Sequence, residues 1–196
     1  MSSPGLFIST RGGAAVANFA EALLAGLAPD GGLYMPSAWP SFSTSQIQGF
    51  AGKRYQEVAF EVLEPFVGEC FTAAELKEDI EAAYAGFDPP EIAPLSPMSG
   101  NRHLLELFHG PTFSFKDIAL QLLGRFFARA LKRRDRRATI VAATSGDTGS
   151  AAIAALGGLS GIDVFVLHPR GRISDIQRRQ MTTTAHTNVH NIALDG

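Results

Sequence analysis

Residues 139–167, TIVAATSGDTGSAAIAALGGLSGIDVFVL, place two short apolar runs on either side of a glycine-rich turn and a helix. The first run, Thr139–Ala143, and the second, Ile162–Leu167, have the length and hydrophobicity of buried strands. Small residues between Ser150 and Leu156 predict a helix, which Gly157 and Gly158 close. Because a strand, a helix and a strand in this order form a right-handed crossover, the stretch predicts an α/β fold with a parallel sheet.

The same alternation extends on both sides of this stretch. Residues 102–108 predict a strand, and residues 116–131 predict a helix with its apolar side chains on one face. Ser174 and Gln177 have the spacing of a helix-capping box, and residues 188–194 predict a last strand. Residues 101–196 are therefore predicted to form a parallel-sheet region.

The first third of the chain has a different character. Residues 6–10 predict a short strand, and three helical patterns follow, at residues 15–27, 55–66 and 73–84. Four prolines between residues 88 and 100 exclude a helix interior there and favour an extended crossing. We therefore predict a mainly helical domain at residues 1–87, a proline-rich linker at residues 88–100 and the α/β region at residues 101–196.

Composition narrows the class of protein. The 196 residues are 45% hydrophobic and 18% charged, with a formal net charge of -2, which argues against a polyanionic partner and for a soluble protein. No stretch has the apolar length of a membrane span, and residues 1–5 lack the pattern of a secretory signal. The single cysteine, Cys70, excludes an internal disulfide, so we expect a cytoplasmic protein. The basic run at residues 132–137 lies where a helix is predicted to end. We expect these cations to complement the negative end of the helix dipole and not to bind nucleic acid.

Lys116 is the candidate catalytic residue. Ser114 and Asp117 have capping-box spacing, which would make Lys116 the second residue of a helix. The positive end of the helix dipole and burial beside Phe113 and Phe115 would both favour the neutral amine, the form that attacks an aldehyde. A solvated lysine that passes the two rings to reach water is the alternative from local pattern alone.

The turn Thr144–Gly149 is the second candidate, because a loop between a strand and a helix start can bind an anion through backbone N–H groups. Gly146 and Gly149 permit a tight backbone path, and Ser145 and Thr148 offer hydroxyl donors. The turn is neither a Walker A loop nor a dinucleotide fingerprint, and plain capping explains it equally well. The histidines show no spacing typical of a metal site, so we predict none.

The runs Glu106–Asp117 (ELFHGPTFSFKD) and Ala143–Gly149 (ATSGDTG) closely resemble the threonine synthase family. Residues 9–12 (STRG), residues 26–36 (GLAPDGGLYMP) and residues 169–174 (PRGRIS) resemble that family as well, so the resemblance covers essentially the whole chain. The segments at residues 9–12 and 26–36 look like that family's own N-terminal domain, which other pyridoxal-phosphate enzymes of this fold lack.

The resemblance implies a fold type II enzyme in which Lys116 holds pyridoxal 5'-phosphate as a Schiff base and, once freed, moves protons at the α- and β-carbons. It implies a lyase that converts O-phosphohomoserine and water to threonine and phosphate. Ser145, Gly146, Thr148 and Gly149 would bind the substrate's carboxylate, and Asp147 would belong to the cofactor site. Oligomeric state is not implied.

In that family the loop for the cofactor's phosphate comes much later in the chain, whereas this sequence stops at Gly196. We therefore expect an N-terminal fragment with an incomplete catalytic region, which alone neither binds the cofactor tightly nor makes threonine. Its last strand would leave an open edge and uncovered apolar faces. Two other functions remain open: a related β-replacement or dehydratase enzyme, and a non-catalytic metabolite-binding remnant.

Overall fold

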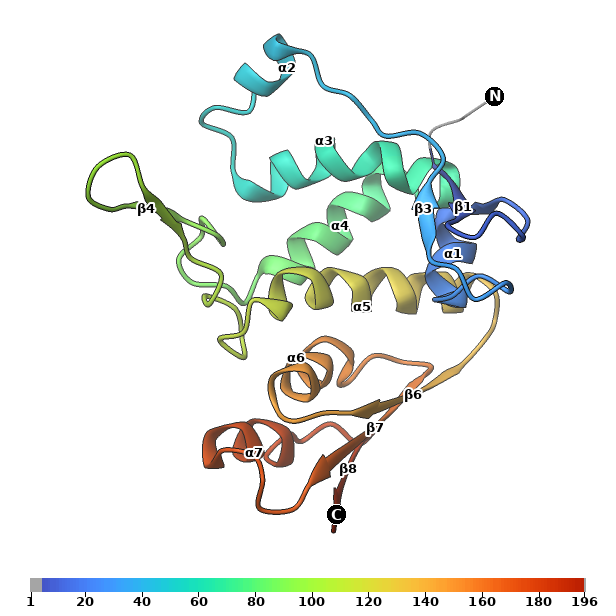
Figure 1. Cartoon of the computed structure of the whole chain (residues 1–196), viewed down its shortest axis with the longest axis vertical. Helices are drawn as coiled ribbons and strands as arrows, with labels where there is room; N and C mark the ends of the chain where they lie inside the picture. Colours follow the sequence, from blue (N-terminus) through green and yellow to red (C-terminus); the bar gives the residue numbers. More distant parts are fainter. Residues whose placement is uncertain (1–4, 196) are drawn as a thin grey trace. The chain divides into compact units, whose positions relative to one another are not determined.

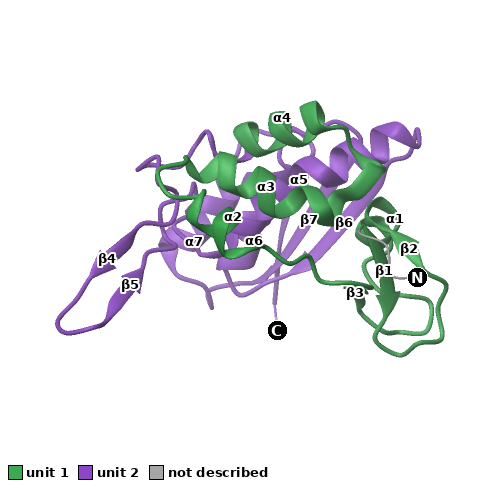
Figure 2. Ribbon diagram, turned by 90° about the horizontal axis from the view of Figure 1, so that it is seen from above, with its two compact units in different colours: residues 1–82 green, residues 83–196 purple. Residues whose placement is uncertain are grey.

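The computed structural model describes residues 5–195, which form two compact units that divide after Ala82 (Figure 2). Unit 1 covers the residues before this point, and unit 2 covers the residues after it. Residues 88–100, which we expected to be an extended crossing, fall inside unit 2. Each unit is described separately below.

Unit 1 combines a small antiparallel sheet with helices (Figure 1). The sheet has the order β2-β1-β3. The elements of unit 1 are β1 (Leu6–Ser9), β2 (Ala17–Asn18), α1 (Phe19–Ala25), β3 (Tyr34–Pro36), α2 (Thr44–Gln48), α3 (Tyr55–Val67), the 3-10 turn η1 (Gly68–Cys70) and α4 (Ala73–Tyr84), whose last residues lie past Ala82.

The helices expected at residues 55–66 and 73–84 are confirmed, and Thr72 and Glu75 bond each other's backbone N–H groups as a capping box. The helix expected at residues 15–27 is shorter than predicted. Asn18 caps α1 through a reciprocal bond with Glu21, so the helix cannot begin earlier, and Ala17 pairs with Phe7 in the sheet.

Unit 2 contains a hairpin, three helices and a parallel sheet within its described residues (Figure 1). Its elements are β4 (Leu95–Pro97), β5 (His103–Leu105), α5 (Lys116–Arg133), β6 (Ala138–Ala143), α6 (Asp147–Leu156), β7 (Ile162–Pro169), α7 (Asp175–Thr182) and β8 (Val189–Leu194). The strand expected at residues 102–108 is shorter than predicted, because its partner β4 begins only after Pro94, which lacks an N–H group. It also pairs antiparallel with β4 in a separate two-stranded sheet, so the prediction that it belongs to the parallel-sheet region is wrong.

The sheet of unit 2 has the order β6-β7-β8 with both pairs parallel, as the sequence predicts. Side chains alternate along β7, with Ile162, Val164, Val166 and His168 buried. This buried face lies under α6 and α7: a Cβ added at Gly149 of α6 would meet both Val166 and Met181. The other face exposes Val141, Ile192 and Leu194, in agreement with the expected uncovered apolar face.

Helix α5 packs on α6 through a close backbone approach. A Cβ added at Gly124 would lie 2.5 Å from the carbonyl oxygen of Ala155, so the two helices meet where a larger residue would force them apart. No helix in the described part of the chain is long and apolar enough to cross a membrane.

Candidate functional site

Lys116 is the first residue of α5, and the capping box expected before it does not form. Ser114 Oγ accepts a hydrogen bond from the Lys116 N–H at 3.3 Å, but the Asp117 carboxylate does not bond back. It instead accepts bonds of 2.8 Å from both the N–H and the hydroxyl of Thr112. Two donors from one residue satisfy both carboxylate oxygens, and this arrangement replaces the predicted one.

Asp117 fixes the loop that precedes Lys116. Its side chain is fully buried, and a Cβ added at Gly110 would lie 2.5 Å from it, so only glycine allows the loop to pass this close. Phe113 adopts a positive φ of 60°, which is uncommon for a bulky residue. The loop is therefore built around the carboxylate next to the candidate catalytic lysine.

The apolar burial expected around Lys116 is not formed by the two neighbouring rings. Phe113 is 73% exposed and Phe115 is 62% exposed, because Ser114 and Asp117 take the inward positions of the loop. Lys116 itself is half-buried, and its Nζ lies 4.5 Å from the centre of the Phe115 ring. Within residues 5–195 the amine makes no ion pair, so it is available to a ligand.

Glu106 and His109 form a pair in the same loop that the sequence did not reveal. His109 Nε2 lies 2.7 Å from a Glu106 carboxylate oxygen, and the Ser96 hydroxyl donates to the other oxygen. The hydrogen bond from Ser96, and then that from His109, lower the pKa of Glu106 below its usual value. The Glu106–His109 spacing of three residues before a Gly-Pro turn was the only signal for this contact.

The loop Thr144–Gly149 connects β6 to α6 and is organised by Thr144. Thr144 Oγ1 accepts hydrogen bonds of 3.1 Å from the N–H groups of Gly146 and Gly149. Helix α6 begins at Asp147, earlier than the predicted Ser150, so half of the loop is its first turn. An acidic residue there complements the helix dipole.

The two glycines of this loop have different roles. Gly146 has a φ of 148°, which side chains rarely permit, and this agrees with the tight path that the sequence predicted. Gly149 is helical, and close packing requires it, because an added Cβ would lie 2.5 Å from Thr144 and 2.8 Å from Met181. Ser145 and Thr148 are exposed, so their hydroxyls can reach a ligand.

Helix α7 contacts both candidate segments through two glutamines that lie on one of its faces. Gln177 Nε2 donates a 2.6 Å hydrogen bond to the Asp147 carboxylate. One turn later, Gln180 Nε2 donates to the Thr112 carbonyl oxygen at 3.1 Å. The structure therefore brings the Lys116 loop and the Thr144–Gly149 loop to the same helix, which sequence reasoning missed because Gln177 was read only as a capping residue.

A cavity of about 360 Å³ opens beside the Thr144–Gly149 loop, at the carboxyl ends of the parallel strands. Ligands of open α/β sheets bind outside these ends. The cavity is lined by Ala143, Thr144, Ser145, Leu167, His168, Pro169 and Leu194. Most of this lining is apolar, and Thr144, Ser145 and His168 supply its polar side chains.

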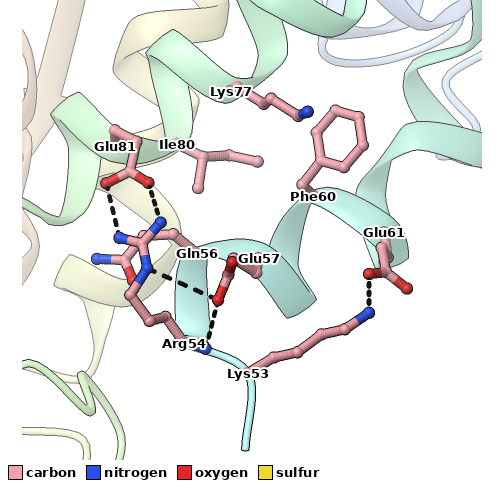
Figure 3. A pocket seen from close by; sticks show the side chains of 9 residues that line it. All are labelled: Lys53, Arg54, Gln56, Glu57, Phe60, Glu61, Lys77, Ile80 and Glu81. Carbon is pink, nitrogen blue, oxygen red and sulfur yellow. Dashed lines mark hydrogen bonds and ion pairs between the residues drawn. The ribbon is translucent and has the colours of Figure 1, made fainter. Parts of the chain in front are cut away.

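Unit 1 has a groove of about 480 Å³ between α3 and α4 (Figure 3). Arg54 bonds Glu81 at 2.8 Å, and Lys53 pairs with Glu61. Lys77 Nζ lies 4.7 Å from the centre of the Phe60 ring. Most charges of the groove thus neutralise one another. Unlike Lys116, the amines of Lys53 and Lys77 each have a partner in the groove, a carboxylate and an aromatic ring from another part of the chain.

The basic run at residues 132–137 is a surface feature at the end of α5. The basic run begins in the last turn of α5, with Lys132 and Arg133, where cations complement the helix dipole as expected. Arg137 bonds Asp163 at 3.1 Å. Across residues 5–195, no three His, Cys, Asp or Glu side chains are arranged to hold a metal ion.

The chain is similar to known proteins over most of its length. Residues 6–84 match the family model described as threonine synthase N terminus. The chain is 50% identical to threonine synthase from Pseudomonas aeruginosa, with 97% of this chain and 40% of the relative covered. It is 46% identical to threonine synthase from Schizosaccharomyces pombe, with 100% and 40% covered.

A crystal structure of PLP-bound threonine synthase from Brucella melitensis is 50% identical to the chain and superimposes with a TM-score of 0.95, covering 97% of this chain and 41% of that one. The yeast threonine synthase structure gives a TM-score of 0.93 at 38% identity, with 98% and 41% covered. The chain spans about 40% of the length of the curated relatives that it matches. Because the similarity to threonine synthases extends over 97% of the chain at 50% identity, in sequence and in superposition, the chain belongs to the threonine synthase family.

Proposed function

We propose that the protein to which this chain contributes converts O-phospho-L-homoserine and water to L-threonine and phosphate, as a pyridoxal-phosphate-dependent carbon-oxygen lyase acting on phosphate. The observation that carries the proposal is that α7 bonds both the Lys116 loop and the Thr144–Gly149 loop, through Gln180 and Gln177. These are the two segments with the donor chemistry that such a reaction needs.

The described residues include an amine that can form a Schiff base with the aldehyde of pyridoxal phosphate. Lys116 supplies an amine without an ion-pair partner within residues 5–195, on a loop anchored by the buried Asp117. Lys116 would hold the cofactor covalently through Nζ. When bound, the cofactor supplies an electron sink for the charge that develops at the substrate's α-carbon.

The chain's own residues then have separate roles. The Lys116 amine would take and return protons at the α- and β-carbons of the substrate. Ser145 and Thr148, together with the backbone of Gly146 and Gly149, would bind the substrate's carboxylate at the start of α6. Asp147 would help to hold the cofactor, and the bond from Gln177 sets the orientation of its carboxylate.

We place this activity in the cytoplasm, where the sole cysteine stays reduced, with a small molecule as the only partner that the site requires. Two other functions predict different behaviour. A β-replacement or dehydratase enzyme would act on unphosphorylated amino acids, and a metabolite-binding remnant would not modify Lys116 at all. The N-terminal family match over residues 6–84 favours threonine synthase over both.

A chimera tests the proposal, in which residues 1–196 replace the matching segment of the Pseudomonas aeruginosa relative. We expect it to release phosphate from O-phosphohomoserine and to form threonine in equal amounts. Borohydride reduction followed by peptide mapping should place a pyridoxyl group on Lys116. K116A should lose both signals, whereas K132A, which removes an exposed lysine at the other end of the same helix, should keep them.

Activity on serine or O-acetylserine without activity on O-phosphohomoserine would support the related enzymes instead. A chimera that folds and binds the cofactor through another residue would contradict the role of Lys116. The isolated chain should show neither the absorbance of a bound cofactor at micromolar concentrations nor any release of phosphate.

A further inference from the structure

The Lys116 loop contains a strained residue three positions before the lysine. Phe113 has a φ of 60°, a left-handed conformation that bulky side chains disfavour. Its ring is 73% exposed, so packing of the ring does not offset this strain. A residue in such a conformation persists only where its surroundings fix the backbone. The backbone contacts around Phe113 must therefore maintain the shape of the loop.

Two hydrogen bonds hold the peptide group between Thr112 and Phe113. The Phe113 N–H donates to the Gly110 carbonyl oxygen at 3.1 Å, which closes a four-residue turn. On the other side of the peptide group, Gln180 Nε2 donates to the Thr112 carbonyl oxygen, also at 3.1 Å. The first bond is local, whereas the second comes from α7, 68 residues further along the chain. Gln180 is thus the contact that tertiary structure adds to this turn.

Rotation of this peptide group would relieve the strain. A planar peptide that turns over changes the φ of Phe113 by about 180°, to about -120°, which lies in the favourable extended region. The same rotation turns the Thr112 carbonyl away from Gln180 and breaks their bond. Asp117 does not prevent it, because Asp117 bonds the N–H and the hydroxyl of Thr112, which precede the rotating group. Gln180 therefore opposes a change that the local backbone favours.

We propose that Gln180 is a positioning residue for Lys116, which acts by holding the Thr112–Phe113 peptide in its strained orientation. Lys116 is the first residue of α5, and residues 113–115 connect it to this peptide. A rotated peptide would send these residues along another path and move the amine away from its reacting position. A displacement of about 1 Å is enough to slow a reaction about 100-fold. The effect on the chemistry of Lys116 rests on the proposed function, whereas the hold on the peptide does not.

NMR of the isotopically labelled chain tests the hold on the peptide directly. At a φ near 60° the amide and α protons of one residue lie close together and give a strong NOE. We expect this NOE at Phe113 in the wild type and in R179M, and its loss in Q180M. Methionine has the length of glutamine but no N–H donor, and Arg179 is an exposed neighbour on the same helix. A strong NOE at Phe113 in Q180M would overturn the proposal.

The chimera with the Pseudomonas aeruginosa relative tests the consequence for Lys116. Cofactor-free chimera is mixed with pyridoxal phosphate, and attachment to Lys116 is followed by absorbance. Without Gln180, the cost of a left-handed residue should leave about a tenth of the molecules with the strained loop, so attachment in Q180M should be about tenfold slower. The kcat should fall by a similar factor while KM changes less than about twofold, because the Thr144–Gly149 loop keeps its bond from Gln177.

R179M should match the wild-type chimera in the rate of attachment, kcat and KM. An unchanged rate of attachment in Q180M would overturn the positioning role of Gln180. Absence of attachment in the wild-type chimera would instead contradict the proposed function, and the NOE of Phe113 would then decide whether Gln180 holds the peptide.

Two replacements of Phe113 separate backbone strain from loss of the ring. F113G removes both, because glycine adopts positive φ readily, whereas F113A removes the ring and keeps the strain. We expect Q180M to slow attachment about tenfold in the F113A background and less than about twofold in the F113G background. If Q180M by itself does not fold, F113G should restore folding to it and F113A should not. Equal effects of the two backgrounds would overturn the proposal.

Discussion

Gln177 and Asp147 are joined by a side-chain hydrogen bond of 2.6 Å, although 30 residues separate them in the sequence. Gln177 also accepts the Ser174 N–H at 3.3 Å as part of the capping box of α7. One side chain therefore caps its own helix and holds the first turn of α6. The order of the Thr144–Gly149 loop thus depends on α7.

Replacement of Gln177 should separate these two roles. Q177A should destabilise unit 2 by about 1–2 kcal/mol, because both the cap and the bond to Asp147 are lost. Q177E keeps a good capping residue but places a second carboxylate against Asp147, so the stability that it loses relative to wild type should be greater at pH 7 than at pH 4. Urea unfolding followed by unit 2 amide signals measures both effects. An equal difference in stability between Q177E and wild type at the two pH values would contradict the contact.

The buried Asp117 should depend on the hydroxyl of Thr112. T112V keeps the shape of the side chain but leaves one oxygen of Asp117 without its donor, so unfolding should become easier by about 1–2 kcal/mol. T112S retains the hydroxyl and should lose less than half of that amount. Denaturant midpoints at constant m-value provide the comparison. If valine and serine behave alike, the hydroxyl does not support the Lys116 loop.

Glu106 should make unit 2 sensitive to acid. The hydrogen bonds from Ser96 and His109 lower the pKa of Glu106 in the folded state, so the folded protein resists protonation more than the unfolded chain does. The resulting stability is fully present above the unfolded pKa, about 4.3, and is lost as pH falls through the lower folded value. E106Q should remove this part of the pH dependence between about pH 5 and pH 3, measured by hydrogen exchange in the β4–β5 hairpin. If the stability of E106Q falls with pH as steeply as that of the wild type, Glu106 does not contribute to the acid sensitivity.

Asp30 should make unit 1 sensitive to acid, as Glu106 does for unit 2. Its carboxylate accepts hydrogen bonds from the Ser9 hydroxyl at 2.7 Å, from Gly32 N–H at 2.9 Å and from Gly13 N–H at 2.8 Å. Led by the bond from Ser9, these contacts lower the pKa of Asp30. Stability is present above the unfolded pKa, about 3.9, and disappears as pH falls below it. Fluorescence of Trp39, the single tryptophan, reports on unit 1. D30N should reduce the loss of unit 1 stability between about pH 5 and pH 3, and S9A should reduce it in part.

Gly146 and Gly171 provide a matched pair of glycine tests. Both have positive φ, at 148° and 68°, but an added Cβ meets the Gln177 side chain only at Gly146. G146A should destabilise unit 2 by about 2–3 kcal/mol, since backbone strain adds to the clash. G171A should cost about 1 kcal/mol, because its conformation is closer to the left-handed helical region and the space around it is open. Equal costs would show that the contact with Gln177 adds nothing.

The sequence by itself determined the order of the elements from α5 to β8 and the parallel pairing of β6, β7 and β8, but not the β4–β5 hairpin that precedes them. Short apolar runs, the glycine turns and the Ser174–Gln177 capping box are local signals, and local energetics suffice to place them. The resemblance of the lysine and glycine loops to threonine synthase also came from sequence alone. The lengths of α1 and β5 were missed because they depend on strand pairing and on proline at a partner strand.

Tertiary structure alone decided how the candidate site is held. Asp117 could bond to Ser114 or to Thr112, and the buried loop selects Thr112 because it offers two donors. Phe113 and Phe115 point outward because the inward positions are already taken. The bonds of Gln177 and Gln180 join segments that are distant in the sequence, and no periodicity records such contacts, since only packing brings these groups within reach.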